Sequence, residues 1–340
     1  MSAAANAGVR GALPLPSDDQ APNSSRANPL VRVGIVSYNT AELLRACLNA
    51  LPAALDGVEA EIVVVDNASS DHSVELLEGY RDMRLVRSEK NVGYARAMNV
   101  ALAGSSAPYL FALNPDVAPE PGSLRILLDV FQKFPDVALV APVLLNVDGS
   151  VQDSVHCFPS ARLALLTHLL PPRLRGSSRY QRWWLRPPTG YGDQVDVDWV
   201  TGAVHCIRRR ALAGAPPYTV RWFMYAEDMD LCWRLRQQGW RVTLEPRAQV
   251  LHVGNASGAL EWSDADREAR WLSATYDWYK GVHGPWRARR WAAAQTLGLL
   301  AKRLAVSAGV GGHPTTEAKH RHADQLEFLL AFHARRVVHP

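Results

Sequence analysis

Acidic and amide side chains directly follow two apolar segments of the sequence, where they could bind a metal ion or a polar ligand. Asp66 follows the run Ile62–Val65, and the segment Asn114–Asp116 follows the run Tyr109–Leu113. If both runs are parallel strands, these groups lie at the carboxyl edge of a sheet, where open α/β sheets bind ligands. Each could also be a plain turn. In the functional alternative, Asp66 accepts a hydrogen bond from a pyrimidine base, and Asp116 binds Mg²⁺ or Mn²⁺ with substrate phosphates.

A third acidic group stands at the start of a predicted helix. Glu227, Asp228 and Asp230 follow the aromatic segment Trp222–Tyr225 and begin a helix over Asp228–Gln238. The helix dipole favours acids in the first turn, so these residues could simply cap the helix. Three acids within four residues are more than capping needs. A carboxylate between aromatic side chains can act as a general base, which is the functional alternative.

A lone histidine follows the last of the predicted strands. Such a residue is more often structural than a metal ligand. His252 is followed by Gly254 and Ser257, however, and could join Asp116 on the metal ion.

Strands that alternate with helices position these groups. The apolar periodicity predicts a helix through Leu43–Leu51 that ends at Pro52, a helix through Leu77 capped by Asp71 or Ser73, and a helix over Tyr94–Ala103. Strands are predicted at Val31–Val36, Ile62–Val65, Leu85–Val86 and Tyr109–Leu113. Because the strands look apolar on both faces, we expect a largely parallel α/β sheet, the first half of a nucleotide-binding architecture.

Beyond Ser150 the pattern is less regular. The proline-rich segment Phe158–Asp193 is predicted to be irregular and to lie over the site. Further strands are predicted at Val195–Val200, Val204–Ile207 and Arg241–Leu244, with Gly239 ending the preceding helix. The chain is predicted to be mainly helical from Asp264 onward, and residues 1–28 to be a disordered tail.

The composition narrows the class of protein. The 340 residues carry a net charge of only +4, which gives no support for nucleic-acid binding. The four cysteines form no C-x-x-C pair, which argues against a zinc site or a disulfide framework and fits a reducing cytoplasm. No apolar stretch follows Arg10 as in a signal peptide, and no segment reads as a membrane span. We therefore expect a cytoplasmic protein that is soluble or attached to a membrane surface.

Seven motifs together resemble the family 2 inverting glycosyltransferases with a GT-A fold, in particular the rhamnosyltransferase-like members of bacterial cell-surface polysaccharide synthesis. In order they span about two-thirds of the chain, and no single one is specific. They are Val36–Asn39, Val64–Ser69, Asn91–Asn99, Leu113–Asp116, Trp199–Ala203, Phe223–Arg234 and His252–Ser257. The resemblance implies a catalytic domain at 29–260, with a nucleotide-binding half at 29–150 and an acceptor half at 151–260. A helical region follows at 261–340.

The resemblance also implies roles for individual residues. Asp66 holds the base, and Asp116 is the main metal carboxylate, since Asn114 replaces the first acid of an Asp-x-Asp motif. His252 is a second contact to the Mg²⁺ or Mn²⁺ ion or the diphosphate. Asp228 is the catalytic base. Further donor-binding residues are Ser37, Tyr38, Asn39, Asn67, Asn91, Gly93, Tyr94, Asn99 and Asn114; the acceptor side is formed by Trp199, Gly202 and Glu227, with Glu227 and Asp230 supporting the base.

A single displacement follows from these roles. The metal ion neutralises the departing diphosphate while Asp228 takes the proton from the attacking acceptor hydroxyl, so that the anomeric configuration inverts. The resemblance favours rhamnose from its dTDP donor, and leaves UDP and GDP donors open. A lipid-linked glycan is the acceptor that we expect.

Other classes fit the sequence less well. A processive polysaccharide synthase would carry membrane spans and a Q-x-x-R-W motif, whereas the segment Gln181–Trp184 has the wrong spacing. A sugar-nucleotide pyrophosphorylase would need a glycine-rich, basic N-terminal loop, whereas Gly34 stands alone within the first predicted strand. An oxidoreductase would need G-x-G-x-x-G after a strand, and the sequence has no such motif. A catalytically inactive binding scaffold remains the main alternative. It would have no reason to keep Asp116, Asp228 and His252.

The C-terminal region has two explanations. No acid lies between Asp277 and Glu317, and the basic residues there are interspersed with tryptophans. The stripe that recurs at helical spacing is Ala293, Leu297, Leu300 and Leu304. It could pack on the catalytic domain as an amphipathic helix, or lie as a basic interfacial helix on an anionic membrane leaflet.

Overall fold

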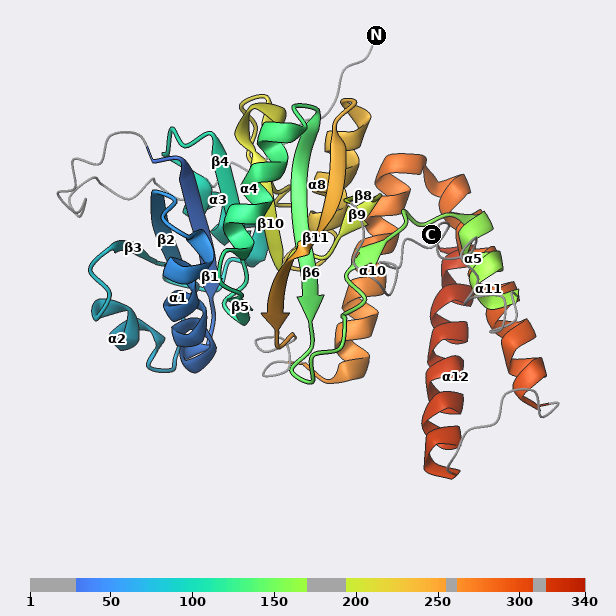
Figure 1. The fold of residues 1–340 in the computed structure, drawn as a ribbon. Helices are drawn as coiled ribbons and strands as arrows, with labels where there is room; N and C mark the ends of the chain where they lie inside the picture. The colour runs from blue at the N-terminus through green and yellow to red at the C-terminus, as the bar shows by residue number, and fades with distance from the viewer. Residues whose placement is uncertain (1–28, 170–193, 255–261, 308–315, 340) are drawn as a thin grey trace, which may run out of the picture.

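The computed structural model describes residues 29–169, 194–254, 262–307 and 316–339 (Figure 1). The predicted tail at 1–28 and most of the predicted irregular segment at 158–193 lie outside these residues. Within the described part, nine strands form one sheet in the order β3-β2-β1-β4-β10-β6-β11-β5, with β8 paired to β11. They are β1 Val31–Ser37, β2 Ala60–Asp66, β3 Met83–Arg87, β4 Tyr109–Leu113, β5 Val117–Pro119, β6 Val137–Leu145, β8 Val195–Asp196, β10 Val204–Arg208 and β11 Arg241–His252.

Helices cover both faces of this sheet, and a short ribbon of two strands lies beside it (Figure 1). The ribbon pairs β7 (Val155–His156) with β9 (Trp199–Val200). The helices are α1 Ala41–Leu55, α2 Ser73–Glu78, α3 Tyr94–Leu102, α4 Ser123–Lys133, α5 Ala161–Leu169, the short η1 Arg209–Leu212, α8 Glu227–Gln237, α10 Asp264–His283, α11 Pro285–Ser307 and α12 Thr316–Val338.

The sheet separates two apolar cores. Alternate residues of a strand point to opposite faces, so Ile35 of β1 packs in one core while its neighbour Val36 packs in the other. The core that contains Ile35 packs α1 and α4 against the sheet, and the core that contains Val36 packs α3, α8, α10 and α11. Because the central strands are buried on both sides, their near-continuous apolar sequences are explained, and the prediction of a mostly parallel α/β sheet is confirmed.

Strand register brings the polar strand ends to one edge. Strands β1, β2, β3 and β4 run parallel, and Ser37 pairs with Asp66 at their carboxyl ends. Strand β10 runs antiparallel between β4 and β6 and interrupts the parallel order. Strand β5 pairs antiparallel with β11, which sets Val117 opposite His252. Asp116, the residue before Val117, therefore lies next to His252 although the two are far apart in the sequence.

Several predicted boundaries are wrong. Pro52 does not end its helix: α1 continues to Leu55, because Ala54 and Leu55 are buried and hold the last turn although proline removes a backbone bond. The predicted strand Val195–Val200 is split between β8 in the main sheet and β9 in the ribbon. Strand β11 is far longer than the predicted Arg241–Leu244. The sequence reasoning also missed helix α4 and strand β6, and β6 completes the sheet between β10 and β11.

The C-terminal helices lie beside the β8 and β11 side of the sheet, opposite β3 (Figure 1). Helix α10 joins them to the part of the chain that contains the sheet, since the buried Trp278 donates its indole N–H to Asp230 of α8 at 3.2 Å. Helix α11 buries Ala288, Trp291 and Leu299. No helix in the described residues is long and apolar enough to cross a membrane.

The predicted apolar stripe of α11 does not pack on the catalytic domain. Leu297, Leu300 and Leu304 are 61%, 43% and 70% exposed. Packing through this stripe was therefore the wrong explanation, because the buried residues of α11 lie on another of its faces. Membrane contact through the stripe stays a prediction.

Candidate active site

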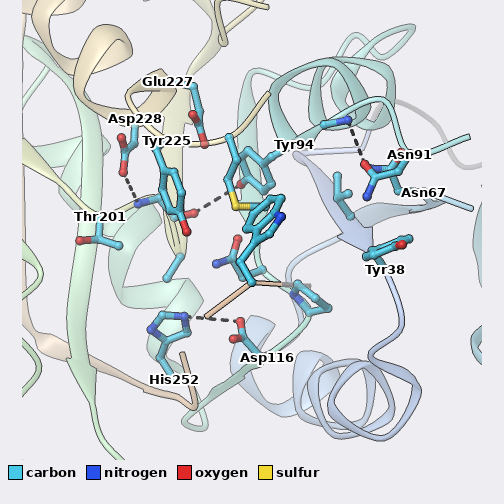
Figure 2. Close-up of a pocket in the computed structure, with 18 residues that line it drawn as sticks. Tyr38, Asn67, Asn91, Tyr94, Asp116, Thr201, Tyr225, Glu227, Asp228 and His252 are labelled. Atoms are coloured by element: carbon cyan, nitrogen blue, oxygen red, sulfur yellow. Dashed lines mark hydrogen bonds and ion pairs between the residues drawn. The ribbon is translucent and has the colours of Figure 1, made fainter. Parts of the chain in front are cut away.

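A cavity of about 210 Å³ opens at the carboxyl edge of β1, β2 and β4, beneath the start of α8. Figure 2 shows the Asp116 and His252 side chains at one end, Glu227 and Asp228 at another, and Tyr38, Asn67 and Asn91 on a third side. Its lining residues are Val36, Tyr38, Asn67, Asn91, Gly93, Tyr94, Asn114, Pro115, Asp116, Thr201, Gly202, Ala203, Met224, Tyr225, Glu227, Asp228, His252 and Trp262. The structure thus brings residues from every predicted acidic or histidine group to one site.

Amide side chains shape the side of the cavity near β2. The Asn67 amide donates to Asn91 Oδ1 at 2.8 Å and accepts from the Val92 N–H at 3.0 Å. Asn91 Oδ1 also accepts from the Gly93 N–H at 3.0 Å. These bonds fix the loop that leads into α3, whose N-terminus at Gly93 and Tyr94 faces the cavity. A helix N-terminus favours a negatively charged ligand such as a phosphate.

Asp66 lies at the end of β2 and does not line the cavity itself. Its Oδ2 atom accepts from the Ser69 N–H at 3.2 Å. Its Oδ1 atom is buried and has no hydrogen-bond partner among the described residues. A buried carboxylate oxygen without a donor is costly, so it is suited to accept a hydrogen bond from a ligand. Contact with a nucleobase, which the sequence predicted for Asp66, stays a prediction.

The loop after β1 contributes one residue to the cavity. Tyr38 lines it, whereas Asn39 and Ser37 support the loop. Asn39 adopts φ +53° and accepts from the Ser70 N–H at 2.7 Å, which ties this loop to the one after β2. The buried Ser37 hydroxyl lies 3.0 Å from the Thr40 hydroxyl. Two of the three predicted donor contacts here therefore act on the loop and not at the cavity surface.

The close pair Asp116 and His252 is oriented by Gln152. His252 Nε2 lies 3.4 Å from Asp116 Oδ1, which is buried and accepts no hydrogen bond among the described residues. The Gln152 amide donates to the His252 carbonyl at 2.7 Å, so its Oε1 atom faces His252 Nδ1 at 2.8 Å and accepts from it. With this tautomer of the uncharged ring, the lone pair of Nε2 faces Asp116, and a cation shared by the two would stabilise the arrangement. A protonated ring would pair with Asp116 directly.

These two side chains fit part of a divalent-metal site. Carboxylate oxygen and imidazole nitrogen are suitable ligands for Mn²⁺, and Gln152 fixes the ring as partners of ligand histidines commonly do. Within the described residues, no group of three or more His, Cys, Asp or Glu side chains could hold a metal ion alone. Among the described residues, these two side chains could serve as ligands, and water or substrate phosphates would have to supply the others.

The Asp228 carboxylate reaches the cavity from the first turn of α8. Its Oδ2 atom accepts from the Gly202 N–H at 3.2 Å, and its Oδ1 atom accepts from the Met229 N–H at 2.7 Å. Gly202 is packed tightly here, since a Cβ atom would lie 3.3 Å from the Asp228 Cβ. Desolvation raises the pKa of Asp228 to about 6, although both backbone hydrogen bonds lower it. Such a pKa suits a general base near neutral pH.

The neighbouring Glu227 carboxyl differs in its protonation. Desolvation, and next the charge of Asp228, raise the pKa of Glu227 to about 8. Its Oε2 atom is buried with no hydrogen-bond partner among the described residues. At neutral pH Glu227 is therefore protonated and can donate a hydrogen bond, while Asp228 is ionised. Adjacent carboxyls with separated pKa values can divide acid and base roles.

The backbone that leads to Glu227 and Asp228 is strained. Tyr225 and Ala226, the two residues before α8, adopt φ +73° and +68° without being glycine. Such conformations cost about 1–3 kcal/mol each and persist at functional sites. The segment is also held from the donor side, because the Tyr94 N–H donates to the Phe223 carbonyl at 3.1 Å. Gly93 permits this approach, since a Cβ there would lie 2.4 Å from the same carbonyl oxygen.

Besides Asp66, Ser37 and Asn39, three further predicted site residues lie outside the cavity. Asn99 clamps the backbone of Tyr218, donating to its carbonyl at 2.7 Å and accepting from its N–H at 3.0 Å. Trp199 is buried, with its ring centroid 4.3 Å from that of His156. Asp230 accepts from the Thr219 hydroxyl at 2.6 Å and from Arg234 at 2.8 Å. Each of these side chains positions a segment around the site and does not face the cavity.

The sequence reasoning missed Gln152 and Trp262. Gln152 follows β6 in a polar turn and has no motif around it, so only the fold shows that it reaches His252. Trp262 lines the cavity just before α10. Tryptophans in this chain are numerous, and no spacing distinguished this one.

Known proteins resemble this chain in sequence. Residues 32–208 match the glycosyl transferase family 2 domain. An N-acetylglucosaminyl-diphospho-decaprenol L-rhamnosyltransferase of Mycobacterium tuberculosis is 30% identical over 281 residues, which are 78% of this chain and 89% of that protein. Rhamnosyltransferase WbbL of Escherichia coli is 23% identical, over 70% of this chain and 89% of its own length.

Solved structures share the fold at lower identity. A mannosyltransferase from Pyrobaculum calidifontis in complex with GDP-Man and Mn²⁺ gives a TM-score of 0.52 at 17% identity, over 94% of this chain and 90% of that one. GalNAc-T7 with UDP, GalNAc and Mn²⁺ gives 0.51 at 16% identity, over 78% and 51%. The chain belongs to glycosyl transferase family 2, and it is a glycosyltransferase with a GT-A type fold.

The separated pKa values predict the pH dependence of catalysis. A base must be deprotonated, so we expect log(kcat/KM) to rise with unit slope on the acid side and to level off near pH 6, the pKa of Asp228. Asp228→Asn should lower kcat by about 10²–10⁴-fold, because general-base catalysis contributes that much. The measurement is initial-rate transfer across the pH range.

The matched control is Glu227→Gln, which mimics the protonated acid. If Glu227 acts as a hydrogen-bond donor, this variant keeps the acid limb at the same pH. A wild-type profile that is flat through pH 6 would show that Asp228 is not the base.

Proposed function

We propose that this glycosyltransferase moves L-rhamnose from a dTDP donor to a hydroxyl of a lipid-linked glycan, with inversion, in bacterial cell-surface polysaccharide synthesis. The observation that carries the proposal is the position of Asp228, which faces the same cavity as Asp116 and His252. The names of the two rhamnosyltransferase relatives support the sugar, and the diphospho-decaprenol acceptor of the first supports a lipid carrier. UDP- and GDP-linked donors are the alternatives.

The chain's own residues perform three tasks in this mechanism. Asp66 and the loop at Tyr38 bind the nucleoside. Both belong to residues 29–150, the nucleotide-binding half. Asp228 takes the proton of the acceptor hydroxyl as that oxygen attacks the anomeric carbon and the nucleoside diphosphate leaves. Protonated Glu227 donates a hydrogen bond to a sugar oxygen and so orients the reacting ring. One displacement inverts the configuration, and no covalent intermediate forms.

Asp116 and His252 would hold Mg²⁺ or Mn²⁺. When bound, the ion neutralises charge on the leaving diphosphate. Both structural neighbours were solved with Mn²⁺ bound, which supports this assignment. The unpartnered Asp116 Oδ1 atom and the fixed tautomer of His252 support it from the chain itself.

The function is tested by donor turnover with purified protein. We expect one of dTDP-rhamnose, UDP-sugars or GDP-sugars to be hydrolysed or transferred in Mn²⁺, with loss of turnover in EDTA and in Asp228→Asn. The product is followed by mass spectrometry, and its anomeric configuration by NMR. An inactive scaffold predicts the opposite: no donor is turned over, and calorimetry detects no nucleotide binding. Binding without turnover would direct the search to the acceptor.

Gln152 provides a test of the metal site that does not need activity. We expect Gln152→Leu to weaken Mn²⁺ binding about 10–100-fold, as changes in the partners of ligand histidines do. The readout is free Mn²⁺ by electron paramagnetic resonance, with a nucleoside diphosphate present. Gln237→Leu, an exposed glutamine on α8, is the control and should bind as the wild type does. Equal affinity of the Gln152 variant and the wild type would remove the orienting role.

We also propose peripheral attachment to the inner membrane face through α11. The exposed Leu297, Leu300 and Leu304 lie on a helix that carries the exposed Arg289 and Arg290 and has no acid. Apolar and cationic groups together favour an anionic leaflet. Sedimentation should show binding to anionic vesicles and little to neutral ones, reduced in Leu300→Ser/Leu304→Ser. Equal binding to both vesicle types, or to neither, contradicts this proposal.

A further inference from the structure

A second cavity lies beside the first, between the segment before α8 and the helix α10. Its volume is about 550 Å³, large enough for a sugar with its substituents. One wall is the segment Arg221–Met224, and the other is formed by residues of α10 from Asp266 to Asp277. Neither the predicted motifs nor the proposed mechanism assigns it a function.

The two cavities meet at Met224, which lines both. Trp262 lines the first cavity, and Arg270 lines the second. The Arg270 guanidinium stacks on the Trp262 ring, with 4.4 Å between the guanidinium carbon and the ring centroid. Phe223 packs edge-on against Trp262 at 6.3 Å between centroids and is 45% exposed. A ligand in the second cavity can therefore extend past these two rings into the first.

Arg270 is available to a ligand. None of the ion pairs within the described residues involves it, whereas its neighbour Arg221 is bound to Asp277 at 2.7 Å. Asp277 also accepts from the Trp222 indole N–H at 2.9 Å, so its charge is compensated. Asp266 is the remaining carboxylate of this cavity, and it accepts from the Ser263 hydroxyl at 2.7 Å. Arginine in such a position is well suited to a phosphate, which it can bind through two parallel N–H groups.

The position of Arg270 distinguishes the acceptor from the donor. The guanidinium of Arg270 stacks on Trp262, which lines the first cavity together with Tyr225. Tyr225 immediately precedes the segment that carries Glu227 and the base Asp228. The metal-binding pair lies at another end of the first cavity (Figure 2). Arg270 is thus on the side from which a hydroxyl must approach the base.

We propose that the second cavity is an acceptor subsite for a phosphorylated sugar, with Arg270 on its phosphate or diphosphate and Phe223 and Trp262 against its pyranose ring. This inference rests on the proposed glycosyl transfer and adds the residues that would bind the acceptor's phosphate and its sugar ring. Aromatic rings present apolar faces that match the C–H face of a sugar. The phosphate stays at α10 while the sugar hydroxyl reaches Asp228. The Phe223 backbone is held by its hydrogen bond from Tyr94, which keeps the boundary between the cavities in place.

The test compares two acceptor probes: N-acetylglucosaminyl diphosphate on a short prenol, and the octyl glycoside of the same sugar, which has no phosphate. In Arg270→Gln, KM for the diphosphate probe should rise about 10-fold or more, since a charge-assisted contact is worth at least one factor of ten. KM for the octyl glycoside and for the donor should not change. Arg270→Lys should recover part of the loss. Arg45→Gln, an exposed arginine on α1, is the matched control and should leave every KM unchanged.

The outcomes are distinct. If Arg270→Gln raises KM for the donor instead, the arginine serves the donor diphosphate and the inference is overturned; unchanged values for both substrates overturn it as well. Calorimetric binding of the diphosphate probe without donor separates this inference from the proposed function. Arg270-dependent binding in a protein that turns over no donor would keep the subsite and remove the transfer. The Arg270 variants should melt at the same temperature as the wild type, because this exposed side chain is not needed for folding.

Discussion

The site is organised by the burial of three carboxyl groups around one cavity. Asp116, Glu227 and Asp228 all line it, and its described lining includes no lysine or arginine. Desolvation raises the pKa of Glu227 and of Asp228, and the charge of Asp228 raises the pKa of Glu227 further. The three carboxyl groups are accommodated in different ways. Glu227 keeps its proton, Asp228 accepts two backbone N–H groups, and Asp116 lies beside the His252 imidazole.

The fold supplies part of the compensation. Helices α3 and α8 both direct their N-termini at the cavity, and the positive end of a helix dipole stabilises nearby anions. The carboxyl ends of the parallel strands deliver Asn67 and Asn114 to the same place. The sequence can reveal this much, because strand ends are recognised by apolar runs and helix starts by acidic first turns. The parallel half of the sheet and most cavity residues were predicted for that reason.

Sequence patterns could not predict the contacts between segments that are distant in the chain. The end of helix α1 depends on whether tertiary packing outweighs one proline, and a local pattern contains no such information. Strand β6 is inserted beside β10 by contacts between segments distant in the chain. Gln152 is a polar turn residue until β6 and β11 bring it to His252. Asn99 and Trp199 stand within motifs that surround the cavity, but their side chains bind the backbone carbonyls of Tyr218 and Cys157.

The acidic group of α8 shows how one motif can contain two functions. Successive residues of a helix are rotated by about 100°, so residues two apart point to nearly opposite sides. Asp228 therefore faces the cavity while Asp230 faces Arg234, Thr219 and the indole of Trp278. Through Trp278, helix α8, which carries Asp228, is bonded to α10, which also carries Arg270. Asp230 thus links the position of Asp228 to that of the second cavity. The burial of Asp230 and its three hydrogen bonds keep helices α8 and α10 aligned.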